Sequence, residues 1–124
     1  MKDAAEYIAY VKSLLISNSQ VVGVKIVREE AQDKFGLYRY RLSLADGGFL
    51  EMFERFEVVS DEVSVTKYSF QWQDAAGTLQ KRWDNAAHHA EVPTHPHHLH
   101  DGSDENVLPH EPVTAIDILK LIGG

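Results

Sequence analysis

Cysteine is absent from this sequence of 124 residues. Disulfide bonds and thiolate metal ligands are therefore excluded, and a bound metal would need histidine, aspartate or glutamate. No run of about 18 apolar residues is present that could span a membrane. The first residues show neither the apolar stretch nor the small-residue cleavage site of a secretory signal. These absences predict a cytoplasmic protein without a membrane segment.

An excess of positive charge is also missing. The formal net charge is −7, which argues against broad binding to DNA or to acidic membranes, because that affinity comes from Lys and Arg displacing counterions. The charge is unevenly distributed, since nine of the twelve Lys and Arg residues lie between Lys25 and Arg82. A local anion site therefore stays compatible with the composition.

The length and the 44% hydrophobic content predict one compact domain over residues 1–124. Asp3 is a typical N-cap for a first helix that ends near residues 17–19, and residues 112–114 open a second helix near the C-terminus. Each segment has apolar residues at three- and four-residue spacing. They are Tyr7, Ile8, Val11, Leu14 and Leu15 in the first, and Ile116, Ile118, Leu119, Leu121 and Ile122 in the second.

Between the two helices the sequence changes to strand-like patterns. Turn residues such as Asp46-Gly47-Gly48 separate segments in which apolar and polar residues alternate, although Glu54 interrupts one apolar stripe. The five expected strands are residues 21–27, 38–44, 49–59, 63–73 and 78–83. The predicted fold class is therefore α+β, an antiparallel sheet of about five strands with an N-terminal and a C-terminal helix.

Periodicity stops between Asp84 and Pro112, where all four prolines and all seven histidines occur. We expect a long His-rich loop, and a loop of this length in a compact domain is usually functional or disordered. The histidines are His88, His89, His95, His97, His98, His100 and His110.

Clustered histidines suit acid–base chemistry. Imidazole can both donate and accept a proton near neutral pH, so two facing histidines suffice as general acid and general base. Such a pair can cleave RNA, because one ring removes the proton of the 2′-hydroxyl and the other protonates the departing 5′-oxygen. This chemistry requires no metal.

The same side chains allow two other interpretations. His95, His97, His98 and His100 have spacings that can converge on a divalent transition metal such as Zn²⁺, which would give a metal-binding domain or a metal-dependent hydrolase. A polar surface loop without chemistry explains the same composition.

The residues just before the cluster add charge and an aromatic ring. Arg82 is suited to hold a phosphate and to stabilise the charge of a phosphorane-like transition state, and Asp84 is suited to orient a histidine through its Nδ1 proton. We expect Trp83 to belong to the core, together with Tyr68, Phe70 and Trp72. Arg39 and Arg41 alternate with tyrosines and should project from the opposite sheet face.

Three segments resemble the TumE-like family of toxins. They are residues 68–72 (YSFQW), residues 82–89 (RWDNAAHH) and residues 93–100 (PTHPHHLH). The resemblance spans roughly residues 35–105, and the two His-rich segments carry most of its specificity. It implies a growth-inhibiting toxin of a type II toxin–antitoxin pair, with ribonuclease activity and with a helix-turn-helix antitoxin as protein partner.

Together, the residues and the resemblance predict a toxin that cleaves RNA by histidine acid–base catalysis, with no cofactor. Two alternatives stay open, namely the metal-dependent domain and a non-catalytic protein-interaction module whose His-rich loop orders only on a partner. The sequence does not decide whether the chain forms a homodimer. The expected catalytic residues are Arg82, Asp84, His88, His89, His97, His98 and His100.

Overall fold

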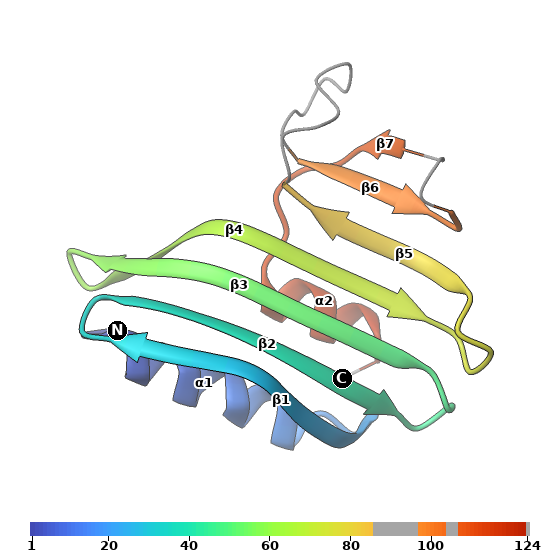
Figure 1. Ribbon diagram of the computed structural model, residues 1–124, viewed down its shortest axis with the longest axis horizontal. Helices are drawn as coiled ribbons and strands as arrows, with labels where there is room; N and C mark the ends of the chain where they lie inside the picture. The colour runs from blue at the N-terminus through green and yellow to red at the C-terminus, as the bar shows by residue number, and fades with distance from the viewer. Residues whose placement is uncertain (86–96, 104–106, 124) are drawn as a thin grey trace.

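The computed structural model describes residues 1–85, 97–103 and 107–123. It has seven antiparallel strands in one sheet, with each strand hydrogen-bonded to the next along the chain, and two helices (Figure 1). The elements are α1 (Ala4–Ser17), β1 (Val21–Gln32), β2 (Phe35–Leu44), β3 (Phe49–Val59), β4 (Glu62–Gln73), β5 (Leu79–Asp84), β6 (His98–Asp101), β7 (Val107–Pro109) and α2 (Ala115–Leu121).

Both helices lie on the same face of the sheet, behind it in Figure 1. Their apolar residues pack with strand residues that alternate with polar ones, as a half-buried sheet requires. The resulting core contains Tyr38 and Tyr40 from β2, Met52 from β3, Phe70 from β4 and Trp83 from β5. The opposite side of the sheet, which we call the open face, has neither helix on it.

The predicted α+β class, antiparallel sheet and terminal helices are confirmed. Asp3 caps α1 by accepting a hydrogen bond from the Glu6 amide, and Thr114 caps α2 in a reciprocal capping box with Asp117. The buried side of α2 differs in detail from the expected stripe, because Ala115, Ile118 and Leu119 are buried whereas Leu121 is exposed.

The structure adds two strands inside the segment expected to be a loop. β6 pairs with β5, and β7 pairs with β6. Both are short, and β7 ends in Pro109, a residue that sheets accept at their edges. Histidine and proline are weak strand signals, so composition concealed these strands. A period of two was nevertheless present, because His98 and His100 flank Leu99, which belongs to the core.

None of the helices in the described part of the chain is long and apolar enough to cross a membrane.

Candidate functional site

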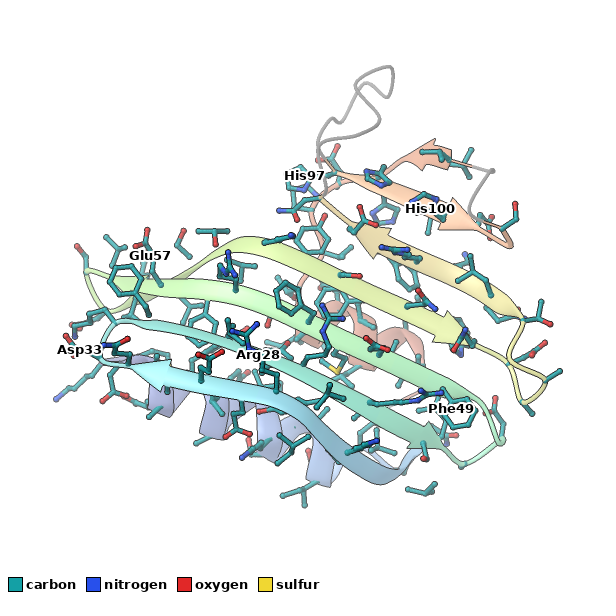
Figure 2. All side chains as sticks on the ribbon, in the orientation of Figure 1. Arg28, Asp33, Phe49, Glu57, His97 and His100 are labelled. Atoms are coloured by element: carbon teal, nitrogen blue, oxygen red, sulfur yellow. The ribbon has the colours of Figure 1, made fainter. Side chains whose placement is uncertain are left out.

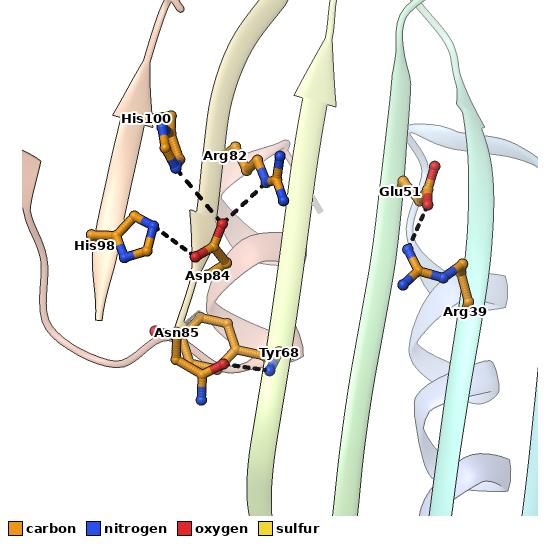
Figure 3. Close-up of polar contacts among 8 residues, drawn as sticks. All are labelled: Arg39, Glu51, Tyr68, Arg82, Asp84, Asn85, His98 and His100. Carbon is orange, nitrogen blue, oxygen red and sulfur yellow. Dashed lines mark hydrogen bonds and ion pairs between the residues drawn. The ribbon is translucent and has the colours of Figure 1, made fainter. Parts of the chain in front are cut away.

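A polar cluster lies where β5 meets β6 on the open face (Figure 3). Nε2 of His98 is 2.7 Å from Oδ1 of Asp84, and Nε2 of His100 is 3.7 Å from Oδ2 of the same carboxylate. Nε of Arg82 is 3.1 Å from Oδ2. One carboxylate therefore contacts three groups that are, or can become, cations. We call these four residues the Asp84 cluster.

Strand periodicity and register bring the cluster together. Arg82 and Asp84 are two residues apart on β5, and His98 and His100 are two apart on β6, so each pair projects from one face. The register places Asp84 opposite His98 and Arg82 opposite His100. Directly opposed side chains lie about 5 Å apart at Cβ, which makes the four neighbours.

The cluster is largely removed from solvent. Asp84, His98 and His100 are 2%, 1% and 3% exposed, whereas the Arg82 side chain is 34% exposed. Burial of a carboxylate is tolerated when cations pair with it, and Asp84 has Arg82 and His98 within ion-pair distance. Arg82 is the member that an incoming anion can reach from solvent.

The geometry suits histidine chemistry. A carboxylate that accepts a hydrogen bond from one ring nitrogen fixes the orientation and tautomer of that ring, which leaves the other nitrogen for proton transfer. Oδ1 of Asp84 lies 2.7 Å from Nε2 of His98, and not beside the Nδ1 atom expected from the sequence, so the carboxylate is close enough to orient this ring. The His98 and His100 rings lie edge to face with centroids 4.9 Å apart.

The same three buried residues could also hold a metal ion. One ligand atom from each of Asp84, His98 and His100 lies within 4.8 Å of the others. Two histidines and one carboxylate are a common ligand set for divalent transition metals. Of the four histidines expected from the sequence as metal ligands, this set contains His98 and His100 and lacks His97, and His95 lies outside the described residues.

His97 points away from the cluster. Its Nδ1 atom is 2.9 Å from the hydroxyl of Tyr68, and the two rings are stacked with centroids 5.7 Å apart. Burial is the main cause that raises the pKa of Tyr68 to about 12, so this phenol keeps its proton at neutral pH. Tyr68 belongs to the core on the helix side, which separates His97 from His98 and His100.

The remaining expected residues divide into two groups. His88, His89 and His95 lie outside the described residues. Trp83 and Phe70 are buried in the core as expected, and the ring of His110 lies edge to face with Trp83 at 6.4 Å. Asn85, next to Asp84, accepts a hydrogen bond from the backbone amide of Tyr68, so its contact is structural.

Two polar residues beside the cluster were not expected from the sequence. Ser69 pairs with Asp84, and Gln71 pairs with Arg82, so both lie on the open face of β4 next to the cluster. The signal was available, because Ser69 and Gln71 alternate with the aromatic residues of that strand. Its meaning depended on knowing the register between β4 and β5.

A second buried acid lies on the helix side. Glu54 is fully buried, and its Oε1 atom accepts hydrogen bonds from the hydroxyls of Tyr7 and Tyr38 at 2.7 and 2.6 Å. Its Oε2 atom has no hydrogen-bond partner in the described part of the chain. Burial raises the pKa of Glu54 above its usual range, and the two phenol hydrogen bonds offset only part of this effect.

The sign of the resulting stability effect follows from proton linkage. A carboxyl whose pKa is higher in the folded state keeps its proton when the unfolded chain has lost it. Stability therefore falls as pH rises from the unfolded pKa through the folded pKa. Tyr7, Tyr38 and the cross-strand neighbour Tyr68 are the titratable groups that face Glu54, and burial raises the pKa of each.

Fold and site together define a small α+β protein with a buried Asp–His–His group beside a partly exposed arginine, on the open face of an antiparallel sheet. The family model described as Toxin TumE matches residues 11–122, so the chain belongs to the TumE toxin family. No curated protein and no solved structure shows a significant match to it. Membership of a toxin family implies a cognate antitoxin.

Proposed function

We propose that this toxin is an endoribonuclease and that the Asp84 cluster is its active site. The observation that carries the proposal is the contact of one buried carboxylate with both His98 and Arg82, next to His100. The arrangement supplies a candidate base, a candidate acid and a phosphate-binding cation on two adjacent strands. We further propose a helix-turn-helix protein as the antitoxin, on the strength of the family resemblance.

In the proposed reaction Arg82 binds the scissile phosphate. His98, oriented by Asp84, removes the proton of the 2′-hydroxyl, whose oxygen attacks phosphorus. The bond from phosphorus to the 5′-oxygen breaks, and His100 donates a proton to that oxygen. The products are a 2′,3′-cyclic phosphate and a free 5′-hydroxyl, and each histidine ends in the protonation state opposite to its starting one.

Burial sets a condition on this mechanism. Because His98 and His100 are both less than one-twentieth exposed, a phosphate bound at Arg82 must displace neighbouring groups to reach them. The reaction therefore includes a local opening step before chemistry.

The metal-ligand geometry supports a second candidate function. If Asp84, His98 and His100 hold a divalent transition metal, the ion would supply an activated water for hydrolysis, and attack by the 2′-hydroxyl would be unnecessary. A 2′-deoxy substitution at the cleaved nucleotide separates the two candidates. It blocks the histidine mechanism and permits metal-assisted hydrolysis.

The function is tested by induced expression in bacteria, with growth and total RNA integrity recorded together. We expect growth arrest and degraded RNA with the natural sequence and with the control His97→Ala. We expect normal growth and intact RNA with His98→Ala or His100→Ala at equal protein level. Arrest that persists with both of these variants would refute the proposed active site.

A further inference from the structure

The open face extends from the Asp84 cluster across four more strands. Cross-strand pairing connects Asp84 with Ser69, Ser69 with Phe53, and Phe53 with Arg39. A parallel row connects Arg82 with Gln71, Glu51, Arg41 and Lys25. Paired residues in adjacent strands project from the same face. The cluster therefore lies at one end of a continuous surface.

This surface is basic, although the protein is acidic. Among the described residues, seven of the twelve Lys and Arg residues project from the open face, against five of the sixteen acidic residues. The cations are Lys25, Arg28, Arg39, Arg41, Arg55, Lys67 and Arg82. The acids are Glu30, Glu51, Glu57, Glu62 and Asp84. A polyanion responds to this local excess and not to the overall charge.

The acids on this face are mostly neutralised by neighbouring cations. Arg28 pairs with Glu30, and Arg39 pairs with Glu51 at 2.7 Å. Among the described residues of the open face, four exposed cations have no ion-pair partner, and the structure gives them no other acidic contact. They are Lys25, Arg41, Arg55 and Lys67.

Two of the arginines on this face lie over aromatic rings. The guanidinium of Arg39 lies 4.6 Å from the ring centre of Phe53, and that of Arg41 lies 5.0 Å from the ring centre of Phe49. Phe49, Arg28 and His100 lie over the sheet face turned to the viewer in Figure 2. A hollow of about 440 Å³ is lined by Lys25, Arg41, Ser43 and Phe49.

The dimensions suit an extended nucleic acid strand. Neighbouring strands lie about 4.8 Å apart, so Arg41 on β2 lies about 14 Å from Arg82 on β5, and Lys25 on β1 about 19 Å. Single-stranded RNA binds to such surfaces through cations that follow its backbone and through flat aromatic or guanidinium groups.

We infer that the open face is a binding surface for single-stranded RNA, and that Arg41 and Lys25 hold phosphates several nucleotides away from the one at Arg82. This inference rests on the proposed ribonuclease function. It predicts that long substrates gain affinity from contacts which a dinucleotide cannot make.

The test measures binding of a fluorescent, non-cleavable 2′-O-methyl RNA oligonucleotide by anisotropy over a range of salt concentrations. The variant Lys25→Gln/Arg41→Gln is compared with Lys2→Gln/Lys120→Gln. The second pair removes the same charge from exposed residues near the helices. Thermal melts check that both variants are folded.

We expect the open-face variant to bind about tenfold more weakly at moderate salt. The slope of log affinity against log salt should fall by about 1.4, because each lost phosphate contact to a single strand contributes about 0.7. The control should bind like the natural sequence. Equal affinity of both variants, or equal losses in both, would overturn the inference, and so would a natural protein that does not bind the oligonucleotide.

Cleavage assays separate this inference from the proposed function. We expect the open-face variant to cleave a dinucleotide at the natural rate and a longer RNA more slowly. If the natural protein cleaves neither substrate but binds the oligonucleotide through Lys25 and Arg41, the ribonuclease proposal fails and the binding surface stands. If both substrates are cleaved at natural rates by the variant, the binding surface fails and the ribonuclease proposal stands.

Discussion

Replacement of Asp84 by asparagine should both destabilise the protein and abolish its activity. The substitution keeps the size of the side chain but removes the charge that Arg82 and His98 face at 3.1 and 2.7 Å. Asp84 is only 2% exposed, so water cannot reach the side chain at this position to replace the lost interaction. An amide also has one acceptor oxygen where the carboxylate has two.

The size of the effect can be worked from these contacts. Removing one partner of a buried ion pair costs about 3–5 kcal/mol. Arg82 is one-third exposed and can recover part of its hydration, and asparagine keeps one acceptor for His98. We therefore expect a loss of about 2–3 kcal/mol in unfolding free energy. For a domain of this length that corresponds to a fall of about 10 °C in Tm.

The assay is thermal and urea unfolding of Asp84→Asn beside the control Glu51→Gln. Glu51 is also a carboxylate paired with an arginine on the open face, but its side chain is 39% exposed, and such surface pairs contribute about 0–1 kcal/mol. We expect the control to melt within a few degrees of the natural protein. An Asp84→Asn variant as stable as the control would refute the argument that the cluster is a buried and electrostatically coupled unit.

Three further predictions concern other parts of the molecule. His97→Ala should still cleave RNA, whereas His98→Ala should not, because His97 contacts Tyr68 on the helix side. Equal losses of cleavage by the two variants in a fluorogenic oligonucleotide assay would contradict this placement. Glu54→Gln should remove a fall in stability that begins as the pH rises above about 4, the usual pKa of a glutamate in an unfolded chain, because the raised pKa of Glu54 makes its ionisation unfavourable in the folded state. Parallel curves of unfolding free energy against pH would argue against it. Leu119→Ala should cost about 2–5 kcal/mol in urea unfolding, because α2 packs into the core through this residue; a loss below about 1 kcal/mol would show that α2 contributes little.

The sheet and helices were predictable because their signals are local. Asp3 and Thr114 are N-cap residues in the positions where helices begin, and Tyr38, Tyr40 and Leu42 alternate with polar residues as a half-buried strand requires. These patterns depend on neighbours a few residues away. They therefore appear in the sequence without knowledge of the fold.

Prediction of the site required the register between β5 and β6, which are separated by a long segment of the sequence. Arg82 and Asp84 were expected to act together with histidines, but the expected set also contained His97, which the structure places on the other side of the sheet. A shift of one residue in a strand exchanges its two faces. Composition alone therefore could not separate His97 from His98 and His100.

The basic open face was concealed for a related reason. The net charge of −7 argued against broad nucleic acid binding. A charge summed over the whole chain does not show how the charged residues divide between the two faces of the sheet. Arg39 and Arg41 were expected on the face opposite the tyrosines, and the structure confirms this placement. The alignment of Arg41 with Arg82, and of Arg39 with Asp84, became visible only from the pairing of four strands.

The most direct test is analysis of the cleavage products that the purified protein forms in excess EDTA. Two substrates are compared, namely a defined RNA oligonucleotide and the same oligonucleotide with one 2′-deoxy nucleotide at the cleaved position. We predict cleavage of the first with 2′,3′-cyclic phosphate and 5′-hydroxyl ends in mass spectra, no cleavage of the second at that position, and no cleavage of either by His98→Ala. Cleavage of the 2′-deoxy copy, or loss of all cleavage in EDTA with recovery on adding a divalent metal, would contradict histidine acid–base catalysis at the Asp84 cluster.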